Sequence, residues 1–114
     1  MKYTAPELNL TIDRGADFTL QLAITEDDGI TAVDCTGYTF AADIRPDFDS
    51  DVLTSFNITE VNLANGNISV SLTDEQTAAL TYDRCVYDVK MTDASGVVTY
   101  LMRGRLIIQG RVTE

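Results

Sequence analysis

Apolar and polar residues alternate with a period of two through most of this 114-residue chain. The clearest case is the segment 18–24, where Phe18, Leu20, Leu22 and Ile24 are separated by single residues, most of them polar. This period is typical of a β-strand with one buried face, because successive side chains of a strand point to opposite sides of the sheet. The same pattern predicts further strands in the segments 8–12, 38–44, 52–58, 68–72, 85–91 and 97–108.

Turn signals separate these segments. Asp28-Gly29 and Asn65-Gly66 are pairs typical of tight hairpin turns, and the second predicts a type I′ turn. Pro46 ends the strand before it, because proline cannot donate a hydrogen bond to a sheet. Thr73 and Gln76 have the spacing of a capping box and predict one helical turn. The last segment, 97–108, has apolar residues at both odd and even positions, which predicts a bulge or register change near Gly104.

About seven short strands at a spacing of roughly ten residues favour a β-sandwich. We therefore predict one all-β domain over residues 1–114, an immunoglobulin-like antiparallel β-sandwich with one short helical turn; an open barrel is the alternative. The chain has no Trp, and Tyr82 lies three residues before Cys85, so the likeness to immunoglobulin domains is architectural only. The residues expected in the core are Phe18, Leu20, Leu22, Phe40, Ile44, Phe56, Val70, Tyr87 and Val89.

The residue inventory argues against catalysis. The chain has no histidine, which removes the commonest general base and metal ligand, and it has no Gly-rich phosphate-binding loop. We expect no enzyme activity, no catalytic residue and no cofactor. Asp47, Asp49 and Asp51 alternate and could converge on a hard cation, but Val52 and Ile58 stand where an EF-hand has Gly and Glu. A solvated acidic loop is the favoured interpretation, and cation binding stays open.

The formal net charge is -10, and the acidic residues are unevenly distributed. Residues 1–57 hold eleven Asp or Glu and three Lys or Arg. An acidic surface repels phosphate backbones, so we expect no nucleic-acid partner. We expect no membrane partner either, because no apolar run approaches the roughly 20 residues of a membrane helix. The first residues show no secretory signal, which predicts folding in a reducing cytoplasm with Cys35 and Cys85 free and buried.

Three of the eight cations gather near the end of the sequence, at Arg103, Arg105 and Arg111. One interpretation is that charged residues protect an exposed edge strand from misplaced pairing. The other is that these arginines form a basic interface that meets the acidic part of a neighbouring copy. Both interpretations stay open.

Several short stretches, taken in order, resemble a recurring pattern of small tailed-phage virion proteins. They are Leu10–Ala16, Val33–Tyr38, Ile44-Arg45, Leu72–Leu80, Val86–Val89, Asp93–Gly96, Arg103–Arg105 and Val112-Thr113. The set is similar to the N-terminal domain of phage upper-baseplate proteins. Cys35 and Cys85 depart from it, since we would expect Leu and an aromatic residue there.

The resemblance implies a non-catalytic structural protein of the virion, made and folded in the host cytoplasm. It implies attachment in the tail, baseplate or neck region, with other virion proteins and copies of the chain itself as partners, in a homo-oligomer or a symmetric array. It transfers no catalytic or binding residue. Two alternatives stay open: a capsid decoration (cement) protein, and a free-standing carbohydrate- or calcium-binding module. A sugar module would use exposed aromatic residues, for which Tyr3, Phe48 and Tyr82 are the candidates.

Overall fold

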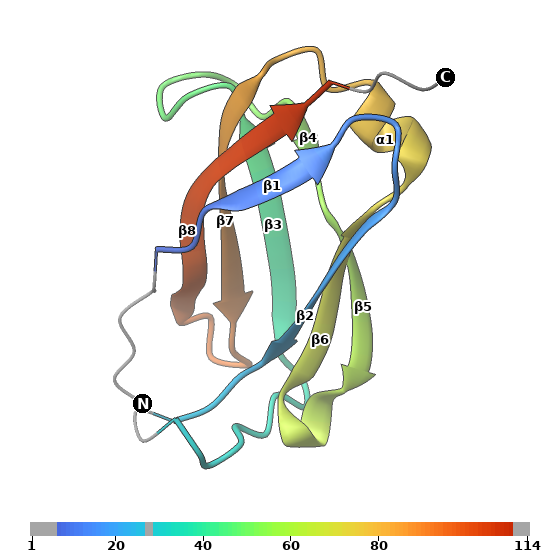
Figure 1. Cartoon of the computed structure of the whole chain (residues 1–114). Helices are drawn as coiled ribbons and strands as arrows, with labels where there is room; N and C mark the ends of the chain where they lie inside the picture. Colours follow the sequence, from blue (N-terminus) through green and yellow to red (C-terminus); the bar gives the residue numbers. More distant parts are fainter. Residues whose placement is uncertain (1–6, 27–28, 111–114) are drawn as a thin grey trace.

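The computed structural model describes residues 7–26 and 29–110, and it contains two β-sheets packed face to face (Figure 1). The larger sheet has the strand order β1 (Leu10–Asp13), β8 (Val98–Gln109), β7 (Arg84–Thr92), β3 (Thr39–Arg45) and β4 (Thr54–Ser55). The smaller sheet has the order β2 (Phe18–Ala23), β6 (Asn67–Leu72) and β5 (Asn57–Asn62). The predicted β-sandwich is confirmed.

Two details differ from the prediction of about seven antiparallel strands. The strand pair β1–β8 is parallel, whereas all other neighbouring strands in the described residues are antiparallel. The single strand expected over 52–58 divides at Phe56, so that β4 lies in the larger sheet and β5 in the smaller one. The chain therefore crosses between the sheets at Phe56, which gives eight strands in the described part of the molecule.

The core lies between the inner faces of the two sheets. Of the nine residues predicted to form it, five are buried: Ile44, Phe56, Val70, Tyr87 and Val89. The other four, Phe18, Leu20, Leu22 and Phe40, pack against this core but are only half-buried. Three of these four belong to β2, which is an edge strand with a neighbour on one side only. The alternation therefore placed these nine residues on the inner faces of their strands, and strand position sets how deeply each of them is buried.

Phe56 joins the two sheets through aromatic contacts. Its ring lies 6.2 Å from that of Phe18 in β2 and 6.0 Å from that of Tyr87 in β7, the second contact being edge-to-face. The Tyr87 hydroxyl donates a hydrogen bond of 2.5 Å to the carbonyl of Leu8. Burial raises the pKa of Tyr87 to about 12, so the phenol is protonated and able to donate.

Gly104 permits this close approach of the N-terminal segment. It lies opposite Tyr87 in the β7–β8 pair, and a Cβ atom at this position would come within 2.1 Å of the carbonyl oxygen of Leu8. The predicted irregularity near Gly104 is wrong in its position, because the register of β8 shifts at Leu101 instead. The backbone at Leu8 leaves no room for a side chain at Gly104.

Local signals around the smaller sheet gave mixed results. The capping box is confirmed: the Thr73 hydroxyl accepts from the N–H of Gln76, whose side chain accepts from the N–H of Thr73, at the start of α1 (Asp74–Ala78). The type I′ turn is wrong, because a 3₁₀ helix, η1 (Leu63–Asn65), ends at Gly66 with φ of 70°, and no described non-glycine residue has positive φ. The first residue of the hairpin turn predicted at Asp28-Gly29 lies outside the described ranges.

Both cysteines are free and buried, as predicted. The Cys35 thiol lies 3.9 Å from the sulfur of Met91, and burial raises the pKa of both thiols. Protonated, buried thiols behave as small apolar side chains. Among the described residues, no helix is long and apolar enough to cross a membrane.

The depth of burial predicts unequal costs for two phenylalanines of the inner faces. Phe56 is 5% exposed and contacts both sheets, so Phe56→Ala should lower the free energy of unfolding by about 3–5 kcal/mol. Phe40 is half-buried near the start of β3, so Phe40→Ala should lower the free energy of unfolding distinctly less. Urea denaturation of both variants measures the difference. An equal or larger loss for Phe40→Ala would contradict the role given to Phe56.

Candidate interaction surface

The outer face of the larger sheet carries most of the positive charge of the described residues. Of the eight Lys and Arg, Lys2 and Arg111 lie outside the described ranges. Arg14 lies in the β1–β2 connection. The other five belong to β3, β7 and β8 and alternate with buried residues, which places them on the outer side. They are Arg45, Arg84, Lys90, Arg103 and Arg105.

The strand registers arrange these residues in rows across the sheet. One row runs from Arg45 through Val86 to Arg105. A second row runs from Asp43 through Asp88 to Arg103.

The rows on either side of these two complete the surface. Lys90 lies opposite Tyr100, and Arg84 lies opposite Ile107. We call this surface the basic face and define it by ten residues: Asp43, Arg45, Arg84, Val86, Asp88, Lys90, Tyr100, Arg103, Arg105 and Ile107. It holds five cations and two carboxylates on a chain of net charge -10.

A bulge in β8 adds an aromatic ring to the basic face. Val89 pairs with Met102 and Lys90 pairs with Tyr100, so Leu101 is the extra residue. Leu101 and Met102 are both buried. The exposed residues of β8 are therefore even-numbered before the bulge and odd-numbered after it. Tyr100 is thereby 42% exposed, and the Arg103 guanidinium lies 5.7 Å from its ring centroid. Simple alternation would have grouped Tyr100 with Met102, so this contact could not be predicted from the sequence.

Two carboxylates occupy the centre of the basic face. Asp43 and Asp88 lie opposite each other, and the Ser55 hydroxyl donates a 2.7 Å hydrogen bond to Asp43. Desolvation and the charge of Asp43 raise the pKa of the Asp88 carboxyl, while Arg103 and other nearby cations lower it less strongly. The two carboxylates divide the cations into groups and reduce their mutual repulsion.

Among the described residues no ion pair involves a cation of the basic face, although Asp43 and Asp88 lie beside these cations and Glu7 lies opposite Arg103. The ion pair found there joins Arg14 to Asp83 at 3.7 Å and lies outside this face. Arg45 donates a hydrogen bond of 2.6 Å to the carbonyl of Ser50. Arg84, Arg103 and Arg105 are exposed, and Lys90 is half-buried. Positive charge on this face is therefore available to an approaching anionic group.

The structure places two of the three arginines of the predicted interface on one surface, together with three further cations. Arg103 and Arg105 share the outer side of β8, whereas Arg111 lies outside the described residues. The alternation of the predicted strand 85–91 is compatible with Arg84, Asp88 and Lys90 on its outer side. It did not connect them with Arg103 and Arg105, because alternation along one strand does not show which strand lies beside it.

The acidic loop 47–51 is stabilised by its own hydrogen bonds. The Asp47 carboxylate accepts from the backbone N–H of Asp49 at 3.0 Å and from the Ser50 hydroxyl at 2.7 Å. These bonds lower the pKa of the Asp47 carboxyl. Asp47, Asp49 and Asp51 are all exposed, and the described residues contain no group of three or more His, Cys, Asp or Glu arranged to hold a metal ion.

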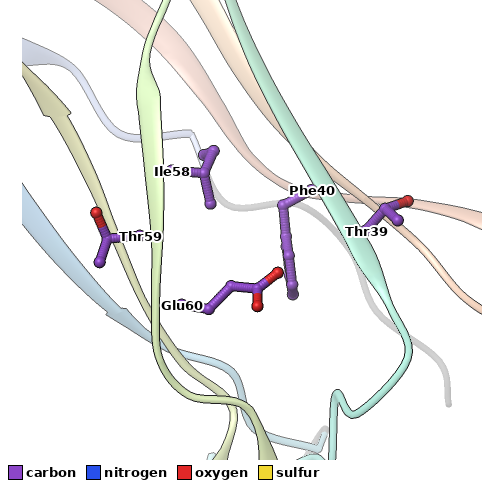
Figure 2. Close-up of a pocket in the computed structure, with 5 residues that line it drawn as sticks. All are labelled: Thr39, Phe40, Ile58, Thr59 and Glu60. Atoms are coloured by element: carbon purple, nitrogen blue, oxygen red, sulfur yellow. The ribbon is translucent and has the colours of Figure 1, made fainter.

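An open groove of about 580 Å³ lies between β3 and β5, at one side of the sandwich. Figure 2 shows the Glu60 carboxylate and the Phe40 ring turned toward each other across it. Ile58 and Thr39 also line it. Glu60 is the one titratable group among its described lining residues, so the groove does not assemble a nucleophile with a base.

Comparison with known proteins adds no assignment: the sequence matches no protein-family model and no curated protein.

The environment of Asp88 predicts a pH-dependent effect on stability. Its pKa is raised in the folded state, so the ionised carboxylate costs stability at neutral pH, and the cost disappears as the pH falls through this raised pKa. Asp88→Asn should raise the free energy of unfolding at neutral pH by no more than about 1 kcal/mol, because the site is partly exposed. The gain should vanish in acid.

Urea denaturation at neutral and acidic pH measures this effect. Glu60→Gln is the matched control, because Glu60 is exposed on β5, which belongs to the smaller sheet. A loss of stability for Asp88→Asn at neutral pH would show that the surrounding cations outweigh desolvation and Asp43.

Proposed function

We propose that this chain is a non-catalytic structural protein of a phage virion, attached in the tail, baseplate or neck region through protein–protein contacts. The assignment to a virion follows from the sequence resemblance. The observation that supports attachment by protein contacts is the basic face, where five cations and an exposed tyrosine gather on one sheet of an acidic chain.

The composition of the basic face is typical of a protein interface. Arginine and tyrosine are enriched in such interfaces and often carry much of the binding energy. Here Tyr100 and Ile107 are 42% and 43% exposed, and Arg103 and Arg105 stand between them along β8. A partner could bury the apolar groups and pair with the guanidinium groups at the same time.

The charges favour an acidic protein surface as the partner. Asp43 and Asp88 lie in the middle of the basic face, where a continuous run of phosphates would meet them. The net charge of -10 opposes the approach of a nucleic acid as well. A protein can place its carboxylates opposite the arginines and leave the centre to polar groups. Other virion proteins and acidic surfaces of further copies of this chain meet that description.

Neutralising the basic face should reduce the amount of this chain on virus particles. The test is the double variant Arg103→Gln, Arg105→Gln, produced in cells infected by phage that lacks the gene. The control is Thr59→Glu, Ala64→Glu, which changes the net charge by the same amount at exposed positions in β5 and η1, outside the larger sheet. Both proteins are first shown by thermal denaturation to fold like the wild type. Particles are then purified, washed in rising salt and probed for the chain.

We expect the wild-type chain and the control on the particles, and the arginine variant to be lost at lower salt, because exposed charge pairs are screened. Absence of the wild-type chain from the particles would contradict the virion assignment. Equal retention of all three would contradict the role of the basic face. If the chain is present but its deletion leaves assembly and infection unchanged, a capsid decoration role replaces attachment in the tail.

A further inference from the structure

The sandwich has four edge strands in its described part, and β2 differs from the other three. β4 has two residues and β1 has four. β5 has six residues, but its register shifts after Glu60. Such short or irregular edges are the usual protection against pairing with another chain. β2 has none of this protection: its six residues, Phe-Thr-Leu-Gln-Leu-Ala, are uncharged and pair with β6 without interruption.

The inner side of β2 also leaves apolar surface uncovered. Phe18, Leu20 and Leu22 face the core but are half-buried, whereas their partners Leu72, Val70 and Ile68 in the neighbouring strand are fully buried. The difference arises because β6 has a strand on each side and β2 has one. A further strand beside β2 would cover the remaining apolar surface and pair the backbone groups that an edge strand leaves free.

We propose that the strand beside β2 is the β2 strand of a second copy, paired antiparallel about a two-fold axis. Side chains alternate with a period of two. The apolar residues of the two strands therefore lie on the same side of the pair only if even-numbered residues of one strand lie opposite even-numbered residues of the other. Leu20 opposite its counterpart, or Gln21 opposite its counterpart, satisfies this condition. The two smaller sheets then form one continuous six-stranded sheet, and the contact is closed by symmetry.

The absence of charge from β2 permits a second copy as the occupant. Two molecules of net charge -10 repel each other, so they can associate closely only where the contact itself brings no like charges together. β2 meets this condition, since Thr19, Gln21 and Ala23 on its outer side are neutral. Pairing through β2 also leaves the basic face, which belongs to the other sheet, free for a different partner.

Sedimentation velocity of the purified chain tests the pairing without any virus particle, so its result is independent of the proposed function. We expect a wild-type dimer that Gln21→Lys weakens roughly tenfold or more, because lysines then face each other across the two-fold axis. Thr59→Lys is the matched control: Thr59 and Gln21 flank Ser69 in the same row, on opposite edges of the smaller sheet. The control should dimerise like the wild type.

Cross-linking identifies the contact directly. In either register two Gln21→Cys side chains come within about 8 Å of each other, so a short bis-maleimide should join them, while the Thr59→Cys dimer should not be cross-linked. The native cysteines are buried and should not react. A wild-type monomer at the highest soluble concentration, or a dimer that Gln21→Lys leaves intact, would overturn the proposal. Capture of a different virion protein by Gln21→Cys on particles, with no cross-linked dimer, would overturn the choice of a second copy.

Discussion

The packing of Phe56 between the two sheets is the contact on which the sandwich depends. The chain leaves the larger sheet at this residue and enters the smaller one, so the side chain lies where the two layers must be held together. Its ring contacts Phe18 on one side and Tyr87 on the other. Tyr87 extends the connection to the N-terminal segment through the carbonyl of Leu8. One series of contacts thus links the smaller sheet, the larger sheet and the segment that leads into β1.

With the core fixed in this way, the two faces of the larger sheet have different roles. Its inner face is apolar, and its outer face gathers five cations from the consecutive strands β7 and β8 and from β3, which is distant from them in the sequence. The bulge at Leu101 contributes to both faces, because Leu101 and Met102 are buried and Tyr100 is turned outward beside Arg103. A single extra residue therefore fills the core and completes the exposed surface.

Several features that depend on neighbouring residues could be predicted from the sequence, although the local Asn65-Gly66 signal predicted the wrong type of turn. Alternation placed Ile44, Val70 and Val89 in the core, and the Thr73–Gln76 spacing located the helix start, because both signals arise within a few residues. Features that depend on strand order could not.

Two features show why strand order matters. Arg45 and Arg105 flank the same residue, Val86, only because β3 and β8 both pair with β7. Likewise, the bulge at Leu101 is visible only against its partner strand.

A reconstruction of the intact virion at side-chain resolution would test most directly whether the basic face is the attachment surface of this chain. If it is, Tyr100, Arg103 and Arg105 lie against a neighbouring protein, and carboxylates of that protein lie opposite the two guanidinium groups. A chain whose basic face is open to solvent, and which is held to the particle by another surface alone, would contradict the account.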